Sequence, residues 1–319
     1  MVNCKWYIVL AFVLSACTQV PVVEKTMHVC ASAPQARACA MSYAHGEWIN
    51  ILCGRTQEGT YPTTALRYNT LTDEWTETGT LPIPARVNGT LCATDQGVFL
   101  GLGFAGGTVN QDSNYLHDWW NIDHTTFSFQ RLADFPAPQT VAPVSWYDGQ
   151  HIWIACGFHE FTNDIWCYDI ASDTWSKSSR LSPMRVMSAV VASCEGRTFI
   201  GTGFHTQSQS EWFEWTADEA WHRRASVPGK GRHNAACGTT DHAVWVVGGW
   251  HYGDSLTTGF HYEDILRYSP SEDTWTLCGT IPCGTTENGV ACGIGNKLYF
   301  GLGEDKNGQL HTNWYYIED

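Results

Sequence analysis

The sequence predicts an all-β protein, a propeller of six four-stranded blades arranged around a central axis. Three observations predict this fold. An aromatic residue that follows a polar turn recurs about every 50 residues, a spacing typical of propeller blades. A short apolar run that closes on glycine occurs six times. Helical periodicity is nearly absent, whereas short apolar runs separated by glycine favour strands.

The polar turns are the first repeated element. Much the same string occurs as YNTLTDEW from Tyr68, as YDIASDTW from Tyr168 and as YSPSEDTW from Tyr268. Asp, Ser and Thr side chains bond nearby backbone N–H groups, which favours a tight reversal between the third and fourth strands of a blade. The closing Trp is large and apolar, so we expect it to fill the gap between neighbouring blades. The aromatic residues in this position are Trp75, Phe127, Trp175, Trp221 and Trp275.

The apolar runs are the second repeated element, and each predicts the second strand of a blade. We expect glycine at the end of each run because it permits a backbone angle or a close approach that a Cβ atom would block. The six runs are INILCG, VFLGLG, IWIACG, TFIGTG, VWVVGG and LYFGLG, which end at Gly54, Gly103, Gly157, Gly203, Gly249 and Gly303.

These strings together resemble the kelch repeat, in the form found in secreted bacterial lipoproteins. The resemblance covers residues 27–319 and implies a six-bladed kelch β-propeller. The fifth repeat matches best, with AVWVVGGWH followed by ILRYSPSEDTW. The second repeat departs, because Trp120 and Phe127 stand in the aromatic positions. Only Gly248 and Gly249 form the glycine doublet of the family.

The two ends of the chain predict how the ring closes. The last repeat ends with HTNWYYIED, before a fourth strand. Residues 27–32 align with fourth strands elsewhere in the chain, so we expect them to pair with NWYYIE and complete the sixth blade. Such a closure leaves no exposed sheet edge at the seam. The propeller would therefore occupy residues 27–319.

Residues 1–16 predict a signal peptide. Lys5 precedes an apolar run from Trp6 to Leu14, which is too short for an ordinary membrane-spanning helix. The string LSAC, which ends at Cys17, resembles the lipobox of bacterial lipoproteins. It implies that Cys17 is lipidated, that residues 17–26 form a tether, and that the protein is anchored in the cell envelope of a Gram-negative bacterium, in the outer rather than the inner membrane. A plain secretory signal cut nearby is the alternative.

Charge and cysteine content exclude several classes. The net charge of −14 disfavours binding to nucleic acid. Besides Cys4 and Cys17, eleven of the 13 cysteines remain, and many lie in apolar runs or before glycine, so we interpret them as small buried residues. No CxxC string occurs, and no metal or cofactor is predicted.

The candidate site is the channel mouth, where the loops before the first strand and after the second strand emerge on one face in kelch propellers. Side chains from several blades would converge there. The ligand-binding candidates are Arg37, Arg86, Arg185, Arg232, His159, His205, His251, Trp250, Phe204, Asn234 and Asn288. The catalytic candidates are Glu287, Glu304 and His205.

A purely structural role for these residues is also open. Arginine at the start of the first strand recurs in many kelch repeats, where it can bond loop carbonyls. His159, His205 and His251 share one repeat position, so they can be packing residues, and a three-histidine metal site is a further alternative.

Three functions fit this pattern. The first is a ligand-binding module for a glycan, with an acidic sugar suited to arginines because they grip carboxylates through two parallel bonds. The second is an enzyme, since the chain more distantly resembles the N-acetylneuraminate epimerases, which are sialic acid mutarotases, although no catalytic motif of theirs aligns. The third is a scaffold that binds an envelope protein or an acidic peptide. The resemblance to galactose oxidase is weaker, because no matching copper site is present.

Overall fold

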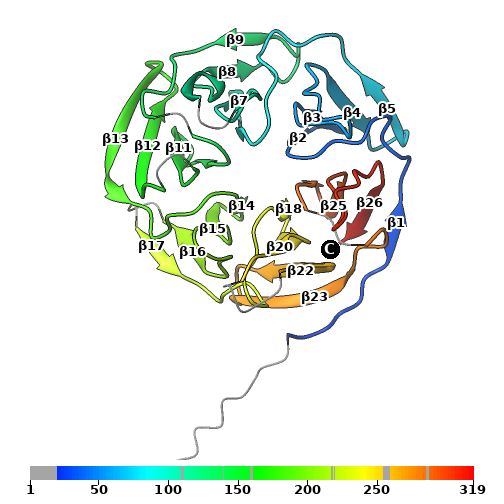
Figure 1. Cartoon of the computed structure of the whole chain (residues 1–319). Coiled ribbons are helices and arrows are strands. Elements are labelled where there is room, and N and C mark those ends of the chain that lie inside the picture. The colour runs from blue at the N-terminus through cyan, green and yellow to red at the C-terminus, as the bar shows by residue number, and fades with distance from the viewer. Residues whose placement is uncertain are drawn as a thin grey trace, which may run out of the picture.

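The computed structural model describes residues 20–108, 111–138, 140–158, 161–216, 218, 220–253, 259–284 and 287–319. Across these residues six four-stranded sheets surround a central axis (Figure 1). The prediction of a six-bladed all-β propeller is confirmed. Blades 1 to 3 consist of β2 (Met41–His45), β3 (Trp48–Leu52), β4 (Ala65–Asn69) and β5 (Glu74–Glu77); β6 (Thr90–Thr94), β7 (Gly97–Gly101), β8 (Trp119–Ile122) and β9 (Phe129–Arg131); and β10 (Val144–Tyr147), β11 (His151–Ala155), β12 (Asp164–Asp169) and β13 (Thr174–Leu181).

Blades 4 and 5 follow the same order, and blade 6 takes its outer strand from the other end of the chain. The strands are β14 (Val190–Cys194), β15 (Arg197–Gly201), β16 (Trp212–Trp215) and β17 (Trp221–Arg223); β18 (Ala236–Thr240), β19 (Ala243–Val247), β22 (Asp264–Ser269) and β23 (Thr274–Thr280); and β24 (Val290–Ile294), β25 (Lys297–Gly301), β26 (Trp314–Glu318) and β1 (Met27–Val29).

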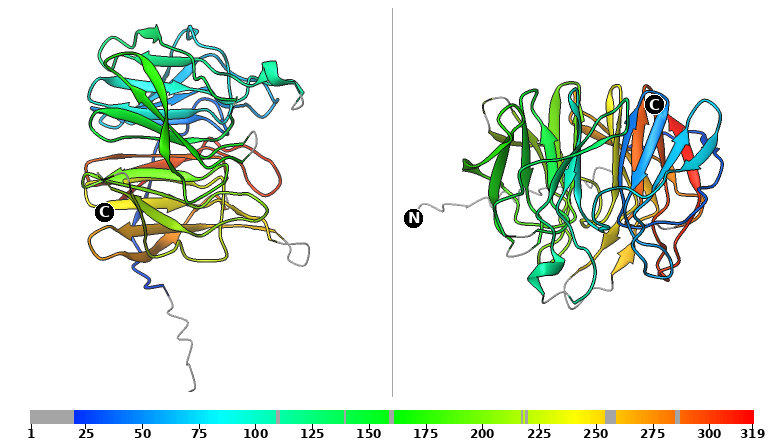
Figure 2. Two further views of the ribbon diagram at one scale, coloured as in Figure 1. Left: turned by 90° about the vertical axis from the view of Figure 1, so that its left-hand side faces the viewer. Right: turned by 90° about the horizontal axis from the view of Figure 1, so that it is seen from above.

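Two smaller elements belong to the loops that follow the second strand of a blade. The 3-10 helix η1 (Asp112–Asn114) lies in blade 2, and the hairpin of β20 (Trp250–His251) and β21 (Phe260–His261) lies in blade 5. Both edge-on views in Figure 2 show them projecting from the same face of the ring. In the described part of the chain, no helix is long and apolar enough to cross a membrane.

The ring closes where the sequence predicts. β1 pairs antiparallel with β26, with Met27 opposite Ile317 and Val29 opposite Tyr315. The contact continues beyond the strand, because the N–H of Cys30 donates to the carbonyl of Trp314 at 3.0 Å. The N-terminal strand is thus the outer strand of the blade that the C-terminus begins.

Residues 20–26 differ from the expected free tether. Val22 forms a parallel bridge with Leu277 of β23, and the N–H of Val23 donates to the Leu277 carbonyl at 2.9 Å. Lys25 lies 3.6 Å from the carboxylate of Asp319. This segment therefore runs along the outer edge of blade 5. The predicted signal peptide and the predicted lipidation residue Cys17 lie outside the described residues.

The repeated turn string fastens one blade to the next. Asp173 has a left-handed backbone with a φ of 53°, and its Oδ1 accepts bonds from the Tyr168 hydroxyl at 2.7 Å and from the N–H of Ala133 at 2.8 Å. The indole of Trp175 donates to the carbonyl of Ala133 at 2.9 Å. Because Ala133 belongs to the preceding blade, the turn holds two blades together. Blades 1 and 5 repeat the arrangement with Tyr68, Asp73, Trp75 and Ala31, and with Tyr268, Asp273, Trp275 and Ala225.

The closing Trp also fills the gap between blades, as predicted. Trp175 meets Trp119 of blade 2 edge to face, with ring centres 5.4 Å apart. The other two strings make the same contact at the same distance, Trp75 with Trp314 and Trp275 with Trp212. Trp119, Trp212 and Trp314 are fully buried. The apolar core of the propeller is thus a series of layers between adjacent blades.

A closed circle of backbone hydrogen bonds surrounds the axis at the start of the inner strands. One residue from each blade has a left-handed backbone there, with φ between 52° and 57°. Each N–H donates to the carbonyl of the equivalent residue in the preceding blade, at 2.7–3.3 Å. This circle, called the axial ring below, ties all six blades together. Its members are Cys39, Asn88, Ala142, Ser188, Asn234 and Asn288.

The eleven cysteines within the described residues are all free thiols. Burial raises the pKa of Cys92 and of Cys237 to about 12. These two thiols are therefore protonated at neutral pH.

Candidate functional site

Three of the four predicted arginines do not reach the mouth. Arg37, Arg86 and Arg232 are fully buried, with exposed fractions of 0%. The Arg86 guanidinium donates to both carboxylate oxygens of Asp118, at 2.9 and 2.6 Å, and to the carbonyl of Leu102 at 3.0 Å. Arg232 likewise binds both oxygens of Asp264 and the carbonyl of Gly248. These side chains staple the second and third strands of their own blades, so the expectation that they face a ligand is corrected.

Arg37 makes the same staple with weaker acceptors. Its Nη1 donates to the carbonyl of Thr64 at 2.7 Å, and the carboxylate of Glu77 lies 3.8 Å from Nη2. Burial lowers the pKa of Arg37 below its usual value. The donor groups are again directed into the blade.

Arg185 is exposed, because it stands one residue before the position of the other arginines. The position of Arg37, Arg86 and Arg232 in blades 1, 2 and 5 is called the staple position below. The carbonyl of the residue there accepts a hydrogen bond from the glycine that closes the second-strand run of the preceding blade. Gly54 donates to Arg86 in this way and Gly157 donates to Val186. Val186 therefore occupies the staple position of blade 4. The Nε of Arg185 instead donates to the carbonyl of Phe161 at 2.7 Å.

The predicted histidines are held by different partners. His251 is buried, and its Nδ1 lies 3.0 Å from the carbonyl oxygen of Gly231. His205 packs edge-on against Phe161 at 4.6 Å. His159 lies outside the described residues. Among the residues that the structure describes, no group of three His, Cys, Asp or Glu side chains is placed to hold a metal ion.

The mouth itself is built by one short bridge from each blade, directly beside the axial ring. Each bridge joins the residue before the axial ring to the residue after the second-strand glycine. Blades 2, 3 and 4 contribute apolar pairs, whereas blades 5, 6 and 1 contribute pairs with polar or charged members. The pairs are Val87–Phe104, Val141–Phe158, Met187–Phe204, His233–Trp250, Glu287–Glu304 and Ala38–Arg55. The mouth is thus apolar on one side and polar on the other.

Two carboxylates lie side by side on the polar side. The N–H of Glu287 donates to the carbonyl of Glu304 at 2.9 Å, and the reverse bond has the same length. Directly opposed residues of such a pair place their side chains on the same face. The side chains of Glu287 and Glu304 are 15% and 11% exposed, so both are largely desolvated but still reachable from solvent.

Each carboxylate is held by partners from two elements. Glu287 accepts from the side-chain amide of Asn234 at 3.0 Å and lies 3.1 Å from Nε2 of His261. Glu304 accepts from the amide of Asn288 at 2.9 Å and forms a short ion pair with Arg55. The predicted residues Asn234, Asn288, Glu287 and Glu304 are therefore brought together, and three blades position them.

At the axial ring and beside it, the local environment keeps the Cys39 thiol neutral and the Arg55 guanidinium charged. Burial raises the pKa of Cys39 to about 12, and the charges of Glu304 and Glu287 add to this effect. Burial lowers the pKa of Arg55, but the bond and charge of Glu304 outweigh it, so that the pKa is raised overall. The Arg55 guanidinium is therefore charged at neutral pH. The space at the axial ring has a volume of about 160 Å³.

Aromatic side chains pack against His233 and His261 on the polar side of the mouth. Trp250 lies nearly parallel to His261, with ring centres 6.0 Å apart, and meets Tyr252 at 5.7 Å. Phe204 packs against His233 at 5.1 Å. Burial, followed by the charges of His251 and His261, lowers the pKa of His233 to about 4. His233 is therefore neutral at neutral pH.

Sequence reasoning did not single out His261. It lies on the far strand of the β20–β21 hairpin, and that hairpin lengthens the loop after the second strand of blade 5. The length of this loop is the signal that would have indicated an additional side chain at the mouth.

Fold and site together define a six-bladed β-propeller with a two-sided mouth. No family model and no curated protein matches the chain. A solved structure described as that of YjhT is similar, with a TM-score of 0.73 and 15% identity, over 91% of this chain and 99% of that one. At this identity the likeness shows a shared fold.

Proposed function

We propose that this propeller is a carbohydrate-binding protein and that the sugar lies in the mouth, above the axial ring. The observation that carries the proposal is the fixed pair Glu287 and Glu304, each oriented by an amide of the axial ring. Carboxylates are strong acceptors for hydroxyl groups, and few, well-placed polar groups are typical of ligand sites. A sugar also has apolar C–H faces, which suit the phenylalanines of blades 2 to 4.

The buried arginines bear on the class of sugar. The guanidinium N–H groups of Arg86 and Arg232 already donate to Asp118 and Asp264. An acidic sugar would therefore have to bind Arg55, which is already paired with Glu304. A neutral carbohydrate, whose hydroxyls both donate and accept, is the better match. This proposal keeps the glycan predicted from the sequence and changes the expected charge.

Anchoring in the outer membrane through lipidated Cys17 is part of the proposal. Residues 20–26 lie along blade 5, so the anchor would leave the propeller at its outer edge rather than at its mouth. The mouth would then remain open to a ligand.

A mutarotase is the second candidate. The specific observation in its favour is the 3.1 Å contact between Glu287 and His261, which joins two groups of the kind that act as general acid and base. His205, another predicted catalytic candidate, packs against Phe161 instead. Faster anomer exchange of N-acetylneuraminate in proton NMR, lost in Glu287→Gln, would establish this activity.

The test of carbohydrate binding is a glycan array combined with a thermal-shift screen of free sugars and acidic peptides. We expect a neutral sugar to raise the melting temperature of the wild-type protein and not that of the double variant Glu287→Gln, Glu304→Gln. Binding of acidic peptides with no sugar hit would instead support the protein-interaction scaffold and overturn the proposal.

A further inference from the structure

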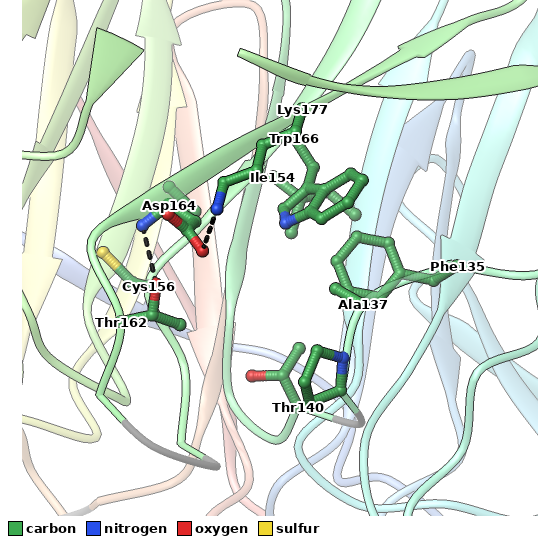
Figure 3. Close-up of a pocket in the computed structure, with 11 residues that line it drawn as sticks. Phe135, Ala137, Thr140, Ile154, Cys156, Thr162, Asp164, Trp166 and Lys177 are labelled. Atoms are coloured by element: carbon green, nitrogen blue, oxygen red, sulfur yellow. Dashed lines mark hydrogen bonds and ion pairs between the residues drawn. The ribbon is translucent and has the colours of Figure 1, made fainter. Parts of the chain in front are cut away.

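Blade 3 contains a cavity that is separate from the mouth. Its volume is about 210 Å³. It lies between the connection from β9 to β10 and the strands β11, β12 and β13. Figure 3 shows Thr140, Asp164, Trp166, Phe135 and Lys177 around this space.

Thr140 occupies the staple position, where blades 2 and 5 have Arg86 and Arg232. The carbonyl of Thr140 accepts a hydrogen bond from Gly103 at 3.0 Å. The carbonyls of Arg86 and Arg232 accept the equivalent bonds from Gly54 at 2.9 Å and from Gly203 at 2.8 Å. The backbone of the three blades is therefore the same at this point, and blade 3 lacks the long cationic side chain.

The acceptors that bind the guanidinium groups in blades 2 and 5 have counterparts in blade 3. Asp118 and Asp264 stand one residue before Trp119 and Ile265, which pair with the last residue of the second strand. Asp164 precedes Ile165, which pairs with Ala155 in the same way. Asp164 thus has the position of the carboxylates that hold Arg86 and Arg232. The cavity also reaches Cys156, and the carbonyls of its equivalents Leu102 and Gly248 accept hydrogen bonds from the arginines.

A lysine currently pairs with this carboxylate from the solvent side. Nζ of Lys177 lies 2.8 Å from the Asp164 carboxylate, and the Lys177 side chain is 51% exposed. An exposed ion pair of this kind is weak, so an entering cation can replace it. Rings line the cavity as well: Phe135 meets Trp166 edge to face at 5.6 Å. In blade 5 the guanidinium of Arg232 lies 3.8 Å from the ring centre of Tyr262, which shows that an aromatic face fits beside the staple.

We propose that the cavity of blade 3 is a second binding site, which takes a monoalkyl guanidinium group. The guanidinium would bind both oxygens of Asp164 and lie against Trp166, as the arginines of blades 2 and 5 bind their own carboxylates. A planar fork matches a carboxylate with two parallel bonds, whereas an ammonium is a point charge. The site therefore discriminates guanidinium from amine. An arginine side chain of a polypeptide and a free small guanidine share this chemistry.

The experiment titrates N-ethylguanidinium into the ¹⁵N-labelled protein and follows the indole N–H resonance of Trp166. We expect saturable binding, with ethylammonium about ten-fold weaker or more. Asp164→Asn should weaken N-ethylguanidinium about ten- to a hundred-fold, because a charge-assisted pair is lost. Lys177→Ala should strengthen it, because the competing ammonium is removed.

Thr140→Arg is the matched control, since it supplies the cavity with its own guanidinium. We expect this variant to melt at a higher temperature than the wild type, to lose that gain when combined with Asp164→Asn, and to bind no N-ethylguanidinium. Equal binding of ethylammonium, or unchanged binding in Asp164→Asn, would overturn the proposal. Tighter binding of N-acetylargininamide than of N-ethylguanidinium would identify a polypeptide side chain as the source, and the reverse order a free guanidine.

Discussion

Burial separates the arginines near the start of the inner strands into two kinds. Arg86 is fully buried against Asp118, whereas Arg185 is exposed and bonds one carbonyl. Arg86→Ala leaves the buried Asp118 carboxylate without its ion-pair partner, which costs about 3–5 kcal/mol of the free energy of unfolding. Urea unfolding measures this loss.

Arg185→Ala is the matched control for this prediction. Because its guanidinium is solvated, we expect a change in the free energy of unfolding within about 0.5 kcal/mol. A loss below about 1 kcal/mol in Arg86→Ala would contradict the assignment of Arg86 to the scaffold.

His233 predicts how stability depends on pH. Burial lowers its pKa from the usual 6.5 to about 4. Between these values the unfolded chain takes up a proton that the folded chain does not, so the free energy of unfolding falls as the pH is lowered. At about 1.4 kcal/mol per pKa unit the loss is roughly 3 kcal/mol.

The variant His233→Gln isolates this effect, because glutamine does not titrate. Urea unfolding at several pH values between 7 and 4 should show a smaller loss of stability in the variant than in the wild type. The same fall in both proteins would exclude His233 as the cause.

At the scale of elements, the turn strings and glycine-ended runs were enough to predict the blades. The spacing of Trp75, Trp175 and Trp275 specifies the period, and their indoles do fill the gaps between blades. The string could not reveal that Asp173 and its equivalents bond the preceding blade, because that partner lies some 40 residues earlier in the chain.

The staple positions show where sequence reasoning fails. Arg185 looks equivalent to Arg86, but a one-residue offset leaves Val186 in the staple position. Only the backbone bonds between blades define this register. For the same reason the sequence did not indicate the cavity at Thr140, or that Arg55 and His261 would meet Glu304 and Glu287.

The seam gives a prediction for a single element. A chain that starts at Pro34 lacks β1, its pairing with β26, and the bond from Trp75 to Ala31. We expect it to lose several kcal/mol of the free energy of unfolding, because an edge ladder and its packing are removed. A chain that starts at Met27 is the control, since it keeps β1 and loses only the contacts of residues 20–26, which reach β23 and, through Lys25, Glu318 and Asp319. If the chain from Pro34 melts within about a degree of the chain from Met27, β1 contributes nothing to closure.

At the scale of the whole molecule, the proposed anchor and the propeller are separable. Cys17→Ser should release the protein from membranes and leave its melting temperature unchanged, because lipidation acts outside the blades. Membrane fractionation and the mass of the N-terminal peptide measure the two states. Unchanged membrane association of the variant, with no acyl mass on Cys17, would contradict the lipid anchor.

The central claim is that the polar side of the mouth binds the ligand, with Glu287 and Glu304 as acceptors. The direct measurement is a calorimetric titration of the best sugar from the screen into the wild type, Glu304→Gln and Glu287→Gln. Glu74→Gln, an exposed position on the outer strand of blade 1, is the control. We expect each mouth variant to lose about 1.5–3 kcal/mol of binding free energy, about ten- to a hundred-fold in Kd, and the control to bind as the wild type does. Wild-type affinity in both mouth variants, with their melting temperatures preserved, would contradict the claim.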